Sequence, residues 1–256
     1  MTFTYLPLEN AIARDGLRMV VVSGGPSPWG EAAKGILYVK DLDWVAVRLD
    51  PTDEALTNWT GVKSAPALMY NDERPRSNWA DILLLAEQLA PAPALLPSDP
   101  AERASVMGYA HEICGAGGLG RARRVALVHA GLQGEGGFDR RRGTYLAEKY
   151  GYNEESGAAA RGRVVGLLGM LAAQLKTQRT AGSAYYFGES LTTVDIYSAT
   201  AMALFRPLPP ELCDMRDPLR AAFDTRDPET DAALDPILIE HRDRMYDRHL
   251  ALPLLL

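Results

Sequence analysis

The fold follows from the stretch Met19-Val20-Val21-Val22-Ser23-Gly24-Gly25-Pro26-Ser27-Pro28-Trp29. Its first four residues are apolar and mostly β-branched, which predicts a buried strand. The glycines and prolines that follow predict a loop, and Pro28 suits the first turn of a helix over Trp29–Tyr38. Trp44–Leu49 then alternates like a second strand. Since parallel strands need a crossover of about a dozen residues, which the helix supplies, the sequence predicts a βαβ unit.

A second group of elements follows this unit. After the polar, weakly patterned stretch Asp50–Ser64, Pro66–Tyr70 predicts a third strand. Asn71-Asp72 is typical of a turn, and the short segment Arg74–Ser77 is expected to pair antiparallel with that strand. Trp79–Leu89 has the broad apolar face of a helix. We expect the residues before Arg18 to pack against this domain.

The composition shifts abruptly at Ala90–Pro100, where a proline-rich segment is typical of a linker between domains. We place the boundary at Leu95, which gives domains over residues 1–94 and 95–256. Beyond the linker, strand signals nearly vanish, and helical spacing extends over Ala101–Val128, Thr144–Thr177 and Thr192–Phe205. The predicted fold class is therefore α/β plus all-α.

Two details of the second domain can be predicted further. Thr192 and Asp195 have the spacing of a capping box, so a helix is expected to begin there. The tail Pro207–Leu256 is rich in Asp-Pro steps, and we expect a segment that wraps the surface.

Composition and charge exclude several classes of function. The 256 residues carry 27 Lys+Arg and 33 Asp+Glu, a net charge of −6, which argues against nucleic acid as the main partner. The N-terminus has neither the basic start nor the apolar run of a signal peptide, and no stretch is long enough to span a membrane. Two cysteines without a CxxC pair, and four histidines without ligand spacing, predict no disulfide framework and no metal site. We expect a cytoplasmic protein.

Together these features resemble the glutathione transferase superfamily. Ser27-Pro28-Trp29 stands where the family's loop carries its catalytic residue, and Ala65-Pro66-Ala67-Leu68 is similar to its cis-proline strand. The segment Leu95–Ala104 resembles the family's linker and first helix, and Phe187–Ile196 resembles its capped core helix. The resemblance, which covers roughly Arg18–Phe205, implies a thioredoxin-like domain followed by an all-helical domain, a homodimer and a role in detoxification.

The chemistry that this resemblance implies is activation of the glutathione thiol. A free thiol has a pKa near about 8.5 and reacts as the thiolate, so a hydroxyl donor beside a helix N-terminus would favour the reactive form. Ser27 is the expected catalytic residue, and the alternative is that Ser27 only caps the helix. Because no cysteine precedes Cys114, a mixed disulfide at this loop is excluded. Conjugation, ether cleavage, dehalogenation and isomerisation all stay open.

The residues expected to bind glutathione include one departure from the family. Pro66 is the expected cis-proline, which would let the backbone of Ala65 pair with the cysteinyl unit of glutathione, and Trp29 either walls the thiol pocket or holds the helix. Where the family has Glu-Ser-x-Ala-Ile for the γ-glutamyl group, this chain has Asn78-Trp79-Ala80-Asp81-Ile82. Trp79 offers only one hydrogen-bond donor at the position where the family has a hydroxyl. Ser77 or Asp81 could compensate for the missing hydroxyl.

A pocket for a second, electrophilic substrate is expected on the helical domain, and its candidate residues are Tyr109, His111 and Glu112. Adjacent helix positions point about 100° apart, so His111 and Glu112 need not share a site. Gly115–Gly120 spells GxGxxG, but helical patterning on both sides favours a glycine-rich break over a dinucleotide site. Arg121, Arg123, Arg124 and Arg140–Arg142 are expected to be solvated faces or anion contacts.

The function that these expectations favour is a glutathione transferase-like enzyme acting on a small apolar or aromatic electrophile. The alternative is a binding or scaffold protein that kept the fold and lost the glutathione site, which the Asn78-Trp79 replacement would allow.

Overall fold

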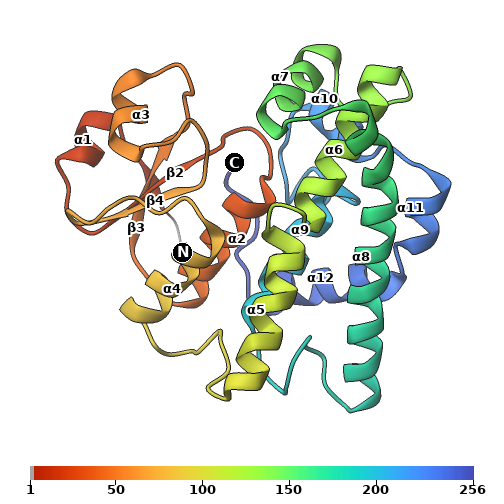
Figure 1. The fold of residues 1–256 in the computed structure, drawn as a ribbon. Coiled ribbons are helices and arrows are strands. Elements are labelled where there is room, and N and C mark those ends of the chain that lie inside the picture. The colour runs from red at the N-terminus through yellow and green to blue at the C-terminus, as the bar shows by residue number, and fades with distance from the viewer. Residues whose placement is uncertain (1–2) are drawn as a thin grey trace.

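A four-stranded sheet forms the core of the N-terminal part of the chain. The computed structural model describes residues 3–256 (Figure 1). The strands lie in the order β1-β3-β2-β4, with β2 and β3 parallel, β1 and β3 parallel, and β2 and β4 antiparallel. Their bounds are β1 (Thr4–Tyr5), β2 (Leu17–Val21), β3 (Trp44–Arg48) and β4 (Ala67–Tyr70). The parallel β2–β3 pair joined by a helix confirms the predicted βαβ unit.

Helices cover both faces of this sheet, and successive buried residues of β2 therefore belong to two different core clusters. On β2, Met19 and Val21 belong to the large core cluster shared with α2 (Pro28–Val39) and α4 (Trp79–Leu89). Val20 belongs instead to a smaller cluster with residues of α1 (Leu8–Ile12) and α3 (Glu54–Thr60). Figure 1 shows α1 and α3 on the side of the sheet away from α2.

Three expectations for this part of the chain can now be compared with the structure. The residues before Arg18 do pack against the sheet, because β1 pairs with β3. The stretch Asp50–Ser64 contains the helix α3, which the weak pattern did not predict. The expected antiparallel pairing of Arg74–Ser77 with the preceding strand is confirmed, although it is limited to a single bridge between Arg76 and Leu68 of β4.

The rest of the chain is helical and is built around one buried helix. Every residue of α9 (Thr193–Ala201) is buried, and Figure 1 shows α9 inside the surrounding helices. The predicted capping box of α9 is present, and the Asp195 carboxylate accepts 2.8 Å hydrogen bonds from both the N–H and the hydroxyl of Thr192. The other helices before the tail are α5 (Pro100–Cys114), α6 (Leu119–Gln133), α7 (Arg140–Tyr150) and α8 (Glu154–Thr180), and the 3-10 turn η1 (Met202–Leu204) follows α9.

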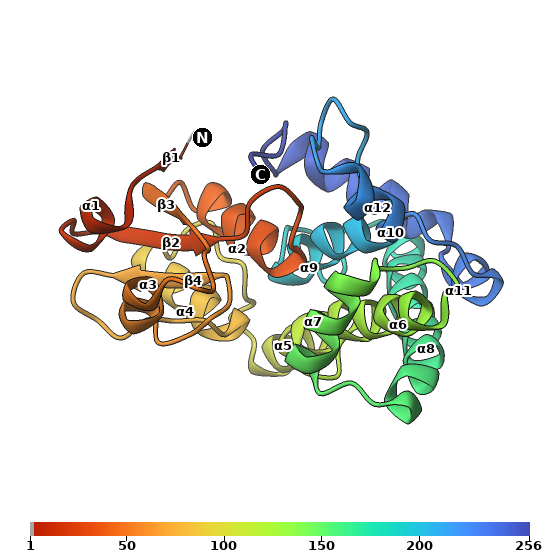
Figure 2. The ribbon, with the colours of Figure 1, turned by 90° about the horizontal axis from the view of Figure 1, so that it is seen from above.

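The C-terminal tail is part of the core, which corrects the expectation of a surface-wrapping segment. It forms α10 (Asp217–Phe223), α11 (Pro228–Ala233) and α12 (Pro236–Arg248). The helix α12 buries six of its residues, and His241 Nε2 lies 2.9 Å from Asp195 Oδ1 inside the protein. Figure 2 shows that the last residues after α12 return toward β1, near the other end of the chain.

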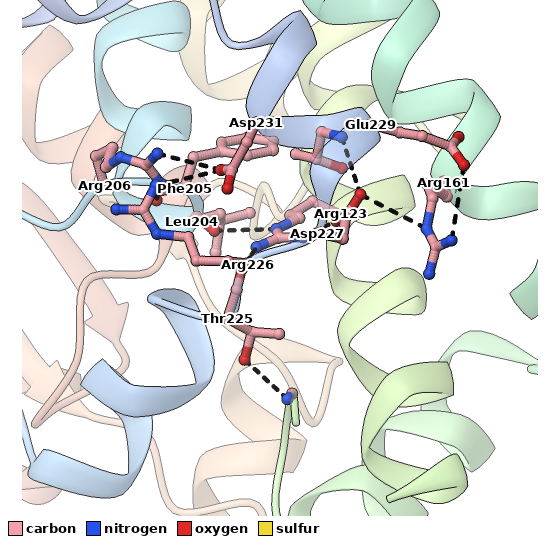
Figure 3. Close-up of polar contacts among 12 residues, drawn as sticks. Arg123, Arg161, Leu204, Phe205, Arg206, Thr225, Arg226, Asp227, Glu229 and Asp231 are labelled. Atoms are coloured by element: carbon pink, nitrogen blue, oxygen red, sulfur yellow. Dashed lines mark hydrogen bonds and ion pairs between the residues drawn. The ribbon is translucent and has the colours of Figure 1, made fainter. Parts of the chain in front are cut away.

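A buried arginine attaches the tail to α6. Arg123 Nε donates to the carbonyl of Leu204 at 3.1 Å, and Nη2 donates to the carbonyl of Thr225 at 2.8 Å (Figure 3). Its Nη1 lies 3.7 Å from Asp227, which also lies 3.7 Å from Arg161. Burial lowers the pKa of Arg123 to about 10, with Asp227 acting in the opposite direction. Arg123 is therefore a structural residue, and the expectation of a solvated face was wrong there.

Candidate functional site

The N-terminus of α2 is the centre of the candidate site. Ser27 immediately precedes the helix in an extended conformation, with φ −83° and ψ 119°, and Pro28 lies in the first turn as predicted. The Ser27 side chain is buried, yet its hydroxyl makes no capping hydrogen bond to the helix. The alternative that Ser27 only caps α2 is therefore not what the structure shows. Its hydroxyl and the first N–H groups of α2 remain available to a ligand.

A cleft of about 220 Å³ lies in front of Ser27. One of its walls comes from the sheet domain and the other from the helical part of the chain. The first wall contains six of the seven residues expected to bind glutathione, namely Ser27, Trp29, Ala65, Pro66, Ser77 and Trp79. The second wall consists of Arg124, Lys149, Tyr150 and Tyr197.

The bend before β4 exposes backbone groups to this cleft. The Ala65–Pro66 peptide bond is cis, as the sequence predicted. Within residues 3–256, neither the N–H nor the carbonyl of Ala65 has a backbone hydrogen-bond partner. An extended peptide lying in the cleft could pair with these groups in the manner of an added strand.

The N-terminus of α4 carries the departure noted in the sequence. Asn78 is exposed and caps α4, its side chain accepting a 2.8 Å hydrogen bond from the Ala80 N–H, so it does not line the cleft. Trp79 does line it, and its ring packs edge-on against Tyr197 with centroids 5.6 Å apart. The Tyr197 hydroxyl donates to the Trp79 carbonyl at 3.2 Å. Trp79 is thus fixed between the two walls, while Ser77 stays exposed at the edge of the cleft.

Trp29 both walls the cleft and connects the two parts of the chain. Its indole N–H donates a 2.8 Å hydrogen bond to the carbonyl of Cys114, the last residue of α5. The glycine-rich segment after Cys114 separates α5 from α6, as predicted. At Gly120 a Cβ atom would lie 3.0 Å from the Trp29 ring, so the glycine permits this close approach. The Arg124 guanidinium also lies over the Trp29 ring, 5.1 Å from its centroid.

The three residues expected to bind the second substrate lie outside the cleft lining. Tyr109 packs edge-on against Phe187, with centroids 5.1 Å apart. Glu112 forms an ion pair with Arg163, and His111 is exposed, with its ring 6.4 Å from that of Trp79. The structure therefore does not bring Tyr109, His111 and Glu112 together into the site.

The helical wall is instead cationic, which the sequence reasoning did not predict. Arg124 Nη1 donates to the Tyr150 hydroxyl at 2.9 Å. Lys149 is exposed at the mouth of the cleft, where partial desolvation, with a smaller contribution from the charge of Arg124, lowers its pKa. Burial raises the pKa of the Tyr197 hydroxyl well above its usual value, so this group stays protonated at neutral pH. The clustering of arginines in the sequence was a signal for this cationic wall, but the sequence did not show that Arg124 lies in the same cleft as Ser27.

Two further features of residues 3–256 bear on the chemistry. No group of three or more His, Cys, Asp or Glu side chains in this range is placed to hold a metal ion. No helix in the same range is long and apolar enough to cross a bilayer.

Comparison with solved structures defines the fold. A glutathione S-transferase from Methylobacterium radiotolerans, in complex with glutathione sulfonate, superposes with a TM-score of 0.62 at 21% identity, over 91% of each chain. This chain has the glutathione S-transferase fold. A second protein of this fold, from Methylobacillus flagellatus with glutathione bound, gives a TM-score of 0.62 at 15% identity, over 91% of this chain and 96% of the other.

A third structure extends the comparison to nearly the whole chain. The glutathione S-transferase of Xanthobacter autotrophicus gives a TM-score of 0.59 at 16% identity, over 94% of this chain and 98% of the other. No protein-family profile matches the sequence, and no curated protein matches it. This chain therefore has the glutathione S-transferase fold although its sequence differs widely from those of the solved proteins. The fold accounts for both its sheet domain and its helices.

Proposed function

We propose that the protein is a glutathione transferase-like enzyme in which Ser27 activates the glutathione thiol. The observation that carries this proposal is the buried Ser27 hydroxyl, which lies at the N-terminus of α2, caps no backbone group and lines the cleft. A thiol placed there would receive a hydrogen bond from Ser27 and face the positive end of the helix dipole. Both interactions stabilise a thiolate and so lower the thiol pKa.

The rest of the sheet-domain wall suits the peptide part of glutathione. The unpaired backbone of Ala65 would pair with the cysteinyl unit, beside Pro66. Ser77 and the N-terminus of α4 would bind the γ-glutamyl end, with the Trp79 indole as an additional donor. Trp29 would close the cleft behind the sulfur. Once ionised, the thiolate attacks a small electrophile that is bound against the helical wall, and the leaving group departs from that electrophile.

The expectations of a cytoplasmic homodimer and of a detoxifying role form part of this proposal, and so does the boundary at Leu95. The solved proteins with this fold include structures with bound glutathione, which supports the choice of cosubstrate. Conjugation, ether cleavage, dehalogenation and isomerisation all start from this same thiolate, and the proposal covers all four.

The first experiment is calorimetric titration with reduced glutathione, combined with ultraviolet titration of the bound thiol. We expect binding in the micromolar to low millimolar range and a bound-thiol pKa below the free value of about 8.5. Ser27→Ala should bind glutathione, raise the bound-thiol pKa toward the free value and slow turnover of chlorodinitrobenzene. Ser105→Ala, a hydroxyl removed from the exposed face of α5, is the matched control and should leave all three unchanged.

One observation favours a second function, a binding or scaffold protein without glutathione chemistry. Trp79 packs on Tyr197 at the place where the family carries a small hydroxyl for the γ-glutamyl group. If wild-type protein gives no heat and no thermal shift with several millimolar glutathione, this second function replaces the first. If glutathione binds and Ser27→Ala leaves both the thiol pKa and turnover unchanged, the assignment of Ser27 is wrong.

A further inference from the structure

Four cations form no ion pair within residues 3–256, and two of them, Arg124 and Lys149, line the cleft. They are Arg124 on α6, Arg142 and Lys149 on α7, and Arg216 just before α10. The ion pairs formed within residues 3–256 involve other side chains and include none of these four. In a protein with a net charge of −6, unpaired cations at this density are unexpected as structural elements.

The four cations also lie close enough to affect one another. Burial lowers the pKa of Arg142 and the charge of Arg216 lowers it further. The charge of Asp139 acts in the opposite direction, and that of Arg124 makes a smaller lowering contribution. At Gly24, in the loop that leads to Ser27, a Cβ atom would lie 3.3 Å from Arg216 Nε. Since like charges at short range destabilise the folded state, this arrangement is better explained by a bound anion than by stability.

Arg124 is positioned to bind such an anion. Its guanidinium lies over the Trp29 ring, and Nη1 donates to the Tyr150 hydroxyl at 2.9 Å. Within residues 3–256, Arg124 Nε is buried and has no hydrogen-bond partner. A guanidinium held in one orientation, with donors to spare, is suited to bind a carboxylate or sulfonate through two parallel hydrogen bonds.

We propose that the second substrate is an organic anion whose carboxylate or sulfonate is bound by Arg124 and Lys149. This inference rests on the proposed function, because it names the substrate class of the same cleft. The two cations belong to the helical wall, opposite the groups that suit the glutathione peptide. The aromatic side chains of Trp29, Tyr150 and Tyr197 line the same cleft, so the anion is expected to be aromatic.

The test uses two fluorescent probes with the same aromatic skeleton. The anion 8-anilinonaphthalene-1-sulfonate differs from neutral N-phenyl-1-naphthylamine only by its sulfonate. With wild-type protein the sulfonate should bind at least about tenfold more tightly than the neutral probe, the ratio expected for a charge-assisted hydrogen bond. Lys149→Met, which removes no described hydrogen bond or ion pair, should weaken the sulfonate by about fivefold or more and leave the neutral probe unchanged.

Three further variants complete the design. Arg124→Met should remove most of the preference for the sulfonate, and Arg124→Lys should restore only part of it because the planar fork is lost. Arg141→Met makes the same charge change at an exposed position of α7 outside the cleft lining, so it should leave both affinities unchanged. Equal affinities for the two probes in wild-type protein would overturn the proposal, as would an equal loss in Lys149→Met and Arg141→Met.

Titration with glutathione separates this inference from the proposed function. If the cations serve the second substrate, glutathione neither displaces the sulfonate probe nor loses affinity in Lys149→Met. If glutathione competes with the probe and binds more weakly to Lys149→Met, the cations bind a carboxylate of glutathione and the inference is wrong. If glutathione fails to bind at all while the sulfonate preference and its loss in Lys149→Met persist, the anion site stands and the transferase assignment fails.

Discussion

The indole N–H of Trp29 donates a 2.8 Å hydrogen bond to the carbonyl oxygen of Cys114. Trp29 lies in the first turn of α2, and Cys114 is the last residue of α5, so this bond connects the helix that follows Ser27 to the helical part of the chain. A carbonyl at a helix C-terminus has no partner within its own helix. The tryptophan supplies that partner and at the same time walls the cleft.

Trp29→Phe should therefore lower both stability and activity. The substitution leaves the Cys114 carbonyl without its donor, and we expect a loss of about 1–3 kcal/mol in the free energy of unfolding, measured by urea denaturation. An aromatic ring still stands at this position, so part of the packing against Arg124 remains. Glutathione turnover should fall as well, because the orientation of α2 relative to the helical wall is less fixed. Unchanged urea midpoints would show that the bond contributes nothing.

The sequence predicted the parts of the site that are contiguous in the chain. Ser27 at the start of α2 and the cis-proline at Pro66 are local patterns, in which turn residues meet a helix or strand. The residues of the helical wall could not be found in this way. Arg124 and Lys149 are 25 positions apart by their numbering, and only the packing of α6 against α7 brings both to the cleft. Tyr109, His111 and Glu112 were expected instead because they lie on the first long helix of this domain, and they stand outside the cleft lining.

Two errors in the predicted elements have physical causes. The helix α3 is short and buries only Leu56 and Thr60, so its apolar period is too weak to detect. In the tail, the Asp-Pro steps favoured a segment that wraps the surface, yet Asp227-Pro228 and Asp235-Pro236 are both helix starts. In each pair the aspartate is the N-cap and its side chain accepts from a backbone N–H, while the proline lies in the first turn.

Asp195→Asn should destabilise the protein strongly. The Asp195 carboxylate is fully buried and accepts four hydrogen bonds, from the Tyr186 N–H, the Thr192 N–H and hydroxyl, and His241 Nε2. An amide presents an NH₂ group to two of these donors, so we expect a loss of about 3 kcal/mol or more in the free energy of unfolding. Asp139→Asn is the control, because Asp139 is exposed and accepts one cap bond, which asparagine can also accept. Equal urea midpoints for the two variants would contradict this account.

Two Gly→Ala variants should change stability in opposite directions. Gly166 lies on the exposed side of α8, and an added Cβ there meets nothing within 4 Å, so Gly166→Ala should stabilise by about 0.5–1 kcal/mol. At Gly131 in α6, a Cβ would lie 2.1 Å from the Phe138 carbonyl oxygen. Gly131→Ala should therefore cost about 1–3 kcal/mol. Thermal unfolding of the two variants side by side tests both signs, and a stabilised Gly131→Ala would show that the loop before α7 moves freely.

The two natural thiols should be unreactive in the folded protein. Cys114 and Cys213 are both buried, and burial raises the pKa of each thiol. The thiolate is the reactive species, so iodoacetamide should modify neither cysteine at neutral pH until the protein is unfolded. Mass spectrometry after timed labelling gives the measurement. Rapid modification of the native wild-type protein would show that one of these thiols reaches solvent.

Ser27→Cys should add one reactive thiol, in contrast to the two unreactive natural thiols. The new thiol would stand at the N-terminus of α2 and face the cleft that contains Arg124 and Lys149, so both the helix dipole and the two cations favour its thiolate. We expect a single fast modification by iodoacetamide. As the pH rises, its rate should reach half its maximum at a pH below the ordinary thiol pKa of about 8.5. Because this readout needs neither glutathione nor an electrophile, it measures the field at Ser27 directly. If the rate reaches half its maximum only at a pH of about 8.5 or above, the cleft does not stabilise a thiolate. The role proposed for Ser27 would then lose its electrostatic basis.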